Sequence, residues 1–254
     1  IEVRASKKGT KDELTEDRAR ELSRDPLAYG MYLLRLNEGH GLVSGAVYTT
    51  TEVLRMGLWI AGKAKGIKTI SSSFYITVPT FRGSEDEVLT FSDCAVVPTP
   101  TSEQLADIAI AASDARTFVV GDVPRVAMLS YSTKGSGGES ESILKVKEAV
   151  DMIRTRRPEL VVDGEIQADV ALVETTAKRK APGGTIQGNA NVLIFPSLDA
   201  ANIAYKLVAT LQPKAQALGP ILQGMNKPIS DLSRGAKVDD IVRIATIVAT
   251  QAKP

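Results

Sequence analysis

Cysteine and histidine are almost absent from this chain of 254 residues, which contains one of each, Cys94 and His40. A single cysteine cannot form a disulfide within the chain, and this sparing use of cysteine fits a reducing compartment. A zinc site built from cysteine and histidine is excluded as well, because a structural site needs four such ligands. We therefore expect a cytoplasmic protein that has no Cys/His metal centre.

Neither an excess of one charge nor a long hydrophobic run is present. There are 31 basic and 30 acidic residues, and a net charge of +1 gives no support from composition for nucleic acid or an anionic membrane surface as a partner. No stretch approaches the roughly 18 apolar residues that span a bilayer, and the polar amino end does not resemble a signal peptide. Hydrophobic residues make up 43% and charged residues 24%, which is ordinary for a soluble globular protein and disfavours general disorder.

The sequence instead alternates short apolar runs with longer amphipathic stretches, a pattern typical of an α/β protein with a mainly parallel sheet. Four junctions consist of a strand, a turn of small residues and a helix. The strands are predicted at 41–46, 126–129, 190–195 and 221–224, and the helices near Glu52 and over 143–153, 201–211 and 238–248.

Three local features refine this pattern. Thr49 and Glu52 have the spacing of a capping box at the start of the first helix. In the fourth junction a long loop through Pro228 and Gly235 is predicted between strand and helix. Residues 71–79 and 88–91 are rich in β-forming side chains and predict a hairpin, and we place a domain boundary just before it.

Two of the junctions are candidates for chemistry, because ligands collect where parallel strands end and helices begin. The 130–138 loop carries hydroxyls, glycines and Lys134, and either cradles an anion or is a plain solvent loop; it matches no Walker A or dinucleotide motif. In the fourth junction, Ser233, Arg234 and Asp240 either face one helix end as a site or are a surface arginine and a charge that stabilises the helix dipole. The residues alone leave both alternatives open.

Four segments, 126–135, 163–169, 190–206 and 219–240, resemble the phosphate acetyltransferase family, of which phosphate butyryltransferases are close relatives. They occur in the family's order over nearly the whole chain. The resemblance implies two three-layer α/β/α domains with mainly parallel sheets and an interdomain cleft, as in isocitrate and isopropylmalate dehydrogenases. We assign residues 1–68 and 220–254 to the first domain and 69–219 to the second. Family members start well before Ile1, so we expect the first domain to be incomplete at its amino end.

The resemblance further implies reversible transfer of an acetyl group between coenzyme A and inorganic phosphate. The implied partners are therefore coenzyme A or acetyl-CoA, acetyl phosphate and phosphate, in a homodimer that needs no metal or bound organic cofactor. Ser233, Arg234 and Asp240 match the family's active-site residues, and Arg55 and Arg4 match substrate-binding arginines. To these we add, as substrate-binding candidates, four hydroxyl side chains at the junctions: Thr49, Thr50, Ser132 and Thr133.

This chemistry suits the residues, because guanidinium groups bind phosphate oxygens in pairs and stabilise a developing oxyanion. Asp240 is the candidate acceptor of the thiol proton. An ordinary aspartate has a pKa of about 3.9 and a thiol about 8.5, so the transfer is uphill by roughly 6 kcal/mol unless the site changes one of the two. We expect positive charge to lower the pKa of the thiol while the proton moves as attack proceeds.

Several alternatives remain beside this reading. Phosphate butyryltransferase differs only in the volume of the acyl pocket, and a non-catalytic domain that senses acetyl-CoA would not need the acid Asp240. A nicotinamide dehydrogenase would need a dinucleotide motif, which the sequence lacks. A Cys94/His40 nucleophile pair is disfavoured because nothing in the sequence brings the two together, and we interpret Cys94 as a packing or cleft-lining residue.

Overall fold

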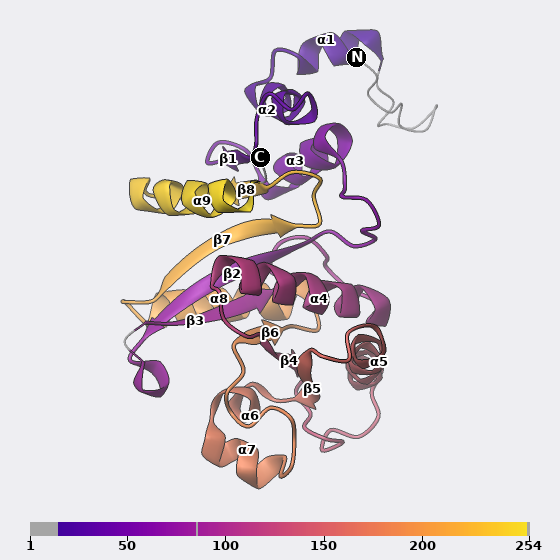
Figure 1. The fold of residues 1–254 in the computed structure, drawn as a ribbon, viewed down its shortest axis with the longest axis vertical. Helices are drawn as coiled ribbons and strands as arrows, with labels where there is room; N and C mark the ends of the chain where they lie inside the picture. Colours follow the sequence, from indigo (N-terminus) through magenta and orange to yellow (C-terminus); the bar gives the residue numbers. More distant parts are fainter. Residues whose placement is uncertain (1–14, 85, 253–254) are drawn as a thin grey trace. The chain divides into compact units, whose positions relative to one another are not determined.

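The computed structural model describes residues 15–84 and 86–252 (Figure 1). These residues form two compact units, which we describe separately. Unit 1 takes the described residues up to Ile67 and from Gly224 onward, and unit 2 takes those of 68–223. The predicted substrate-binding residue Arg4 lies outside the described residues. No helix of the described chain combines the length and the apolar character that crossing a membrane requires.

Unit 1 contains two short parallel strands flanked by helices. Its elements are α1 (Glu16–Leu22), α2 (Pro26–Arg35), β1 (Leu42–Gly45), α3 (Thr50–Met56), the π-helical turn η1 (Gly57–Ala61), β8 (Ile229–Leu232) and α9 (Val238–Gln251). β1 and β8 pair in parallel from Leu42 opposite Ile229 to Gly45 opposite Leu232. α2, α3 and α9 all contact β1, so helices from both ends of the chain cover this pair.

Strand β8 corrects one sequence prediction. Residues 229–232 fall in the segment that we predicted as a long loop, but all four are buried and paired with β1. The flanking Pro228 and Gly235 are typical loop residues, and a run of four is too short to show the alternation of a strand. Its pairing partner is far away in the sequence, so only the tertiary structure reveals the strand.

Unit 2 contains a six-stranded sheet in the order β7-β2-β3-β6-β4-β5. β2 and β3 form the hairpin predicted from the sequence, and β2 also pairs antiparallel with β7, whereas the β3–β6, β6–β4 and β4–β5 pairs are parallel. The elements are β2 (Ser71–Pro79), the 3-10 turn η2 (Phe81–Gly83), β3 (Asp86–Ser92), α4 (Ser102–Val119), β4 (Arg125–Leu129), α5 (Glu141–Arg156), β5 (Val161–Ile166), α6 (Ala168–Leu172), α7 (Glu174–Lys180), β6 (Val192–Ile194), α8 (Leu198–Leu211) and β7 (Gln216–Gln223).

The sheet of unit 2 buries both of its faces. Along β4, Val126 and Met128 pack in one apolar cluster with α4 and α5, while Ala127 and Leu129 belong to a second cluster with α6, α7 and α8. This alternation follows from the strand geometry, in which successive side chains point to opposite faces. Figure 1 shows α4 and α8 on opposite sides of these strands. The predicted three-layer α/β/α arrangement is confirmed for this unit.

Helix α8 has the predicted position and buries part of the predicted face. The spacing of apolar residues predicts an inward face of Ala201, Ala204, Leu207, Val208 and Leu211. Of these, Ala201, Ala204 and Val208 pack on the sheet. Leu207 and Leu211 are instead 53% and 76% exposed. Tyr205, which stacks on Phe74, completes the buried face.

Candidate functional site

The turns that follow β1 and β8 leave the same edge of unit 1, because the two strands are parallel and end in register at Gly45 and Leu232. Thr49 and Thr50 lie at the end of the first turn, and Ser233 and Arg234 in the second. The structure therefore brings together residues from two distant segments that the sequence analysis chose as site candidates. The geometry matches the usual place for ligands in parallel sheets.

Thr49 caps helix α3 as its sequence spacing predicts. Its hydroxyl accepts the amide of Glu52 at 3.2 Å, and the Glu52 carboxylate accepts both the amide and the hydroxyl of Thr49, at 2.7 and 2.8 Å. These hydrogen bonds, the amide of Thr49 first, lower the pKa of Glu52. The Thr49 side chain is thus already used in fixing the start of the helix.

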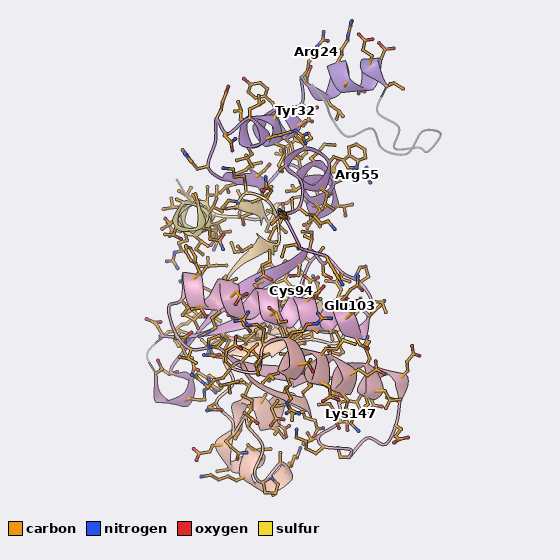
Figure 2. The ribbon with its side chains drawn as sticks, turned by 45° about the vertical axis from the view of Figure 1, so that its right-hand side comes forward. Arg24, Tyr32, Arg55, Cys94, Glu103 and Lys147 are labelled. Carbon is orange, nitrogen blue, oxygen red and sulfur yellow. The ribbon has the colours of Figure 1, made fainter. Side chains whose placement is uncertain are left out.

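The Ser233–Arg234 turn presents polar groups outward. The Ser233 hydroxyl oxygen accepts the amide of Gly235 at 3.2 Å, and the Ser233 carbonyl accepts the amide of Ala236 at 2.9 Å. Arg234 is exposed, and so is Arg55 in the last turn of α3, which Figure 2 shows at the outer side of that helix. Within the described residues, neither guanidinium has a hydrogen-bond or ion-pair partner, so both are available to an anion.

Asp240 lies in the first turn of α9, half-buried, and accepts the backbone amide of Lys237 at 2.9 Å. This contact stabilises the start of the helix, as the plainer of the two sequence interpretations expects. Among the described residues Asp240 forms no ion pair with Arg234 or Arg55. Its assignment as a proton acceptor therefore stays a prediction.

A second aspartate at this edge, Asp231, was missed by the sequence analysis. It is 2% exposed near the end of β8, and its Oδ2 accepts the Thr50 hydroxyl at 2.5 Å. Its Oδ1 is buried without a hydrogen-bond partner. Burial raises the pKa of Asp231, with the Thr50 hydroxyl and the Leu232 amide opposing the shift more weakly. The sequence does show an acidic residue two positions before Ser233. Because residues 229–232 were predicted as a loop and not as a strand, nothing indicated that this residue is buried.

In unit 2, the hydroxyls of Ser132 and Thr133 are engaged within the loop that follows β4. Ser132 is buried, donates to the buried carboxylate of Glu165 at 3.0 Å and accepts the amide of Gly137 at 2.9 Å. The Thr133 hydroxyl donates to the side-chain oxygen of Gln167 and accepts the backbone amide of the same residue. The loop is held firmly in place, and substrate binding by these two hydroxyls stays a prediction.

Lys134 in the same loop makes an ion pair with Asp163, a residue of β5 that is 1% exposed. Arg154 lies 3.8 Å from the same carboxylate. Burial opposes the ionisation of Asp163, but the hydrogen bond and charge of Lys134 outweigh it and lower its pKa. These residues and the glycine-containing segment 181–185 line a cavity of about 250 Å³.

Cys94 is fully buried, and its Sγ lies 3.5 Å from the carbonyl of Phe91. Burial raises the pKa of the thiol, which leaves little thiolate for nucleophilic chemistry. In Figure 2 it lies among the elements of unit 2. Its predicted packing role is consistent with this setting. The part of the chain that the structure describes has no group of three or more histidine, cysteine, aspartate or glutamate side chains that could hold a metal ion.

Comparison with known proteins supplies the family. A sequence model described as "Phosphate acetyl/butaryl transferase" matches residues 3–249. The chain is 46% identical to a phosphate acetyltransferase of Acetivibrio thermocellus over 94% of this chain and 72% of the relative. It is 48% identical to one of Treponema pallidum, over 92% of this chain and 70% of the relative. A phosphotransacetylase structure from Streptococcus pyogenes superposes with a TM-score of 0.86 at 38% identity, covering 93% of this chain and 70% of that one.

Proposed function

The chain belongs to the phosphate acetyl/butyryltransferase family, and from this premise we propose how its residues carry out the reaction. The protein is an acyltransferase that moves an acetyl group reversibly between coenzyme A and inorganic phosphate. Its substrates are acetyl-CoA and phosphate in one direction, and acetyl phosphate and coenzyme A in the other. The resemblance expected from the sequence motifs is confirmed by relatives 46% and 48% identical over most of the chain.

Arg234 and Arg55 bind the phosphoryl group in this proposal. Both guanidinium groups are exposed and unpaired among the described residues, and a guanidinium binds two phosphate oxygens at once. The same positive charge stabilises the oxyanion that develops on the acetyl carbonyl during attack. It also favours the thiolate form of coenzyme A.

Ser233 donates a hydrogen bond to the acyl or phosphoryl oxygen. Its oxygen already accepts the Gly235 amide, so its hydroxyl hydrogen is the part that remains for a ligand. Thr49 serves through the capping box, which fixes the start of α3 and with it the helix that carries Arg55. Asp240 stands in the first turn of α9 and is the acceptor of the thiol proton in this proposal.

Three broader features belong to the same proposal. We propose that the reaction needs no resident metal or organic cofactor, since arginine and hydroxyl side chains supply the charge stabilisation. We also propose a homodimer, which the exposed apolar side chains of Leu207 and Leu211 on α8 support. A cytoplasmic location fits the single, free and buried Cys94.

The observation that carries the proposed site is that the β1 and β8 turns leave the same edge, with Arg234 in the second turn and Arg55 on the helix that starts at the first. The direct test is acetyl-CoA formation from coenzyme A and acetyl phosphate, with butyryl phosphate tested in parallel. We expect acetyl phosphate to give the higher kcat/KM. A chain that binds acetyl-CoA without turning it over would instead be the non-catalytic sensing domain.

Arg234→Ala tests the role of the turn within this assay. We expect kcat to fall by roughly 10²–10³-fold with unchanged circular dichroism, because the oxyanion loses its main cation. The exposed Arg179→Ala on α7 is the matched control and is expected to leave kcat unchanged. Undiminished acetyl transfer by Arg234→Ala would remove this residue from the mechanism.

A further inference from the structure

We propose that unit 2 contains a binding site for a phosphate-bearing anion, in the cavity between Lys134, Arg154 and the segment 181–185. The cavity measures about 250 Å³, and its lining residues all belong to unit 2. The inference goes beyond the proposed function, which uses no residue of this cavity. Binding at this place can therefore be measured whether or not the chain transfers an acetyl group.

The side chains that line the cavity carry one positive charge more than they carry negative charge. Lys134 and Arg154 are the cations, and Asp163 is the acid. The carboxylate of Asp163 is already occupied by donors of the protein. Its Oδ1 accepts Lys134 Nζ and the Gly164 amide, and its Oδ2 accepts the Ile186 amide at 3.3 Å. A ligand that enters the cavity therefore meets a surplus of positive charge.

Several hydrogen-bond donors of the lining are still unused. The Arg154 side chain is 50% exposed, lies 3.8 Å from Asp163 and makes no hydrogen bond within the part of the chain that the structure describes. Lys134 Nζ donates to Asp163 and, at 3.1 Å, to the carbonyl of Gly164, so one of its three hydrogens is left. Thr185 is exposed, and its hydroxyl has no partner among the described residues. The side chains that remain for a ligand thus all offer N–H or O–H donors.

Lys134 is held in place before any ligand binds. Its backbone has a φ of +48°, a conformation that residues other than glycine rarely adopt. The carbonyl of Glu165 accepts the Lys134 amide at 3.2 Å, and the buried carboxylate of Glu165 accepts the Gly135 amide at 2.6 Å. A cation whose backbone is fixed in advance loses less conformational entropy when it binds an anion.

The segment 181–185 lines the cavity partly with backbone. Gly183 has a φ of +78°, and a Cβ at this position would meet no atom within 4 Å. The space beside Gly183 is therefore open, and a ligand can approach the main chain there.

A phosphate group has enough oxygens for both cations. A guanidinium binds two of them at once, and a further oxygen is left for the ammonium group of Lys134. The cavity volume of about 250 Å³ lies below the roughly 300–1,000 Å³ of pockets that enclose whole drug-sized ligands. The site therefore takes inorganic phosphate, a small acyl phosphate or one phosphate group of a larger molecule such as coenzyme A.

The test follows phosphate binding by NMR in the full chain, with the amide signals of residues 134, 183 and 185 as reporters. Inorganic phosphate is added at constant ionic strength, so that the general screening of charges stays the same. We expect the three signals to shift and to saturate together. The absence of a saturable shift, or an equal shift when sodium chloride replaces phosphate, would overturn the site.

Arg154→Gln removes the unused guanidinium and should weaken phosphate binding at these reporters by about tenfold or more, because a charge-assisted hydrogen bond is lost. Arg179→Gln on α7 is the matched control. Arg179 is also an exposed arginine of unit 2 but does not line the cavity, so its variant should keep the wild-type affinity. Melting temperatures check that both variants are folded. An unchanged affinity in Arg154→Gln, or an equal loss in Arg179→Gln, would show that the cavity does not bind the phosphate.

The variant Arg234→Ala separates this site from the proposed function. It lacks a phosphate contact of the proposed site in unit 1, so the reporters of unit 2 should respond to phosphate as in the wild type. Loss of their response would contradict an anion site made by unit 2 alone. A chain that forms no acetyl-CoA but shows the saturable shifts would refute the proposed function and support this inference.

Further probes identify the source of the phosphate group. Acetyl phosphate, coenzyme A and dephospho-coenzyme A, which lacks the 3′-phosphate, are added in place of inorganic phosphate. Shifts with the two small anions but not with coenzyme A support a site for a free phosphate or acyl phosphate. Shifts with coenzyme A that are lost with dephospho-coenzyme A support a site for the 3′-phosphate of the larger molecule.

Discussion

Two buried aspartates, Asp163 in unit 2 and Asp231 in unit 1, occupy similar places and have opposite properties. Each belongs to a strand with a parallel neighbour, and each lies beside a turn that precedes a helix. Asp163 has Lys134 as its ion-pair partner and a lowered pKa. Among the described side chains, only the Thr50 hydroxyl donates to Asp231, and the pKa of Asp231 is raised.

The difference shows what a counter-charge does to a buried carboxylate. An ion pair with additional amide donors offsets the cost of burial, so Asp163 stays charged and holds its loop in place. A neutral hydroxyl donor offsets less, so the pKa of Asp231 is raised. The first arrangement ties a loop to the sheet, and the second leaves a buried carboxylate without an ion-pair partner among the described residues.

The largest expected effect concerns the glycines that lie against these carboxylates. A Cβ on Gly45 would lie 2.5 Å from Asp231 Oδ1 and 2.4 Å from the backbone of Leu232, at a φ of +114°. Gly45→Ala should therefore destabilise unit 1 by about 2–5 kcal/mol and abolish turnover. Thermal unfolding followed by circular dichroism measures the loss.

Gly184→Ala is the matched variant beside Asp163, where the Cβ would meet Oδ2 at 2.8 Å without a positive φ. We expect about 1–3 kcal/mol here, the ordinary cost of overpacking. Equal losses for the two glycines would show that the closer contacts and the positive φ of Gly45 add nothing to the cost.

Lys134→Met removes the counter-charge of Asp163 and should make it resemble Asp231. The Lys134 side chain is 38% exposed, which screens its charge, so we expect a loss of about 1–3 kcal/mol rather than the larger cost of breaking a fully buried pair. Denaturant unfolding measures the change. Carboxyl NMR should show the pKa of Asp163 rising, and a variant whose Asp163 titrates as in the wild type would show that Lys134 is not the controlling partner.

The pH dependence of stability should have opposite signs for the two aspartates. The lowered pKa of Asp163 contributes stability above its unfolded value of about 3.9, and this is lost as the pH falls through the folded value. The raised pKa of Asp231 makes stability fall as the pH rises from about 3.9 through its folded value. Melting temperatures recorded across this pH range check both signs. Asp163→Asn should lose the fall in stability towards low pH, and Asp231→Asn should lose the fall in stability towards higher pH.

The smallest expected effect compares two capping boxes, Thr49 with Glu52 in unit 1 and Thr101 with Gln104 in unit 2. Replacing either threonine by alanine should cost about 1 kcal/mol of stability. Only Thr49→Ala should also raise KM, because its helix carries Arg55 and begins at the proposed site. A KM change in Thr101→Ala would mean that helix caps affect the reaction without contact to the site.

Local signals in the sequence predicted much of this fold. The Thr49–Glu52 spacing predicted the start of α3, and the β-forming side chains of residues 71–79 predicted the hairpin. These features depend on residues that are close in the chain. The inward face of α8 was predicted only in part, because periodicity shows which residues are apolar but does not show which of them meet the sheet.

By itself, the sequence determined the family, the α/β class and the arginine-containing turn, because motifs and periodicities are local. Only the tertiary structure decided which aspartate is incompletely paired. Thr50 and Asp231 come from opposite ends of the chain and meet because β1 pairs with β8, whereas Asp163 meets Lys134 because β4 pairs with β5. The chemistry of a buried carboxylate depends on its spatial neighbours, and these are fixed only when distant strands pair.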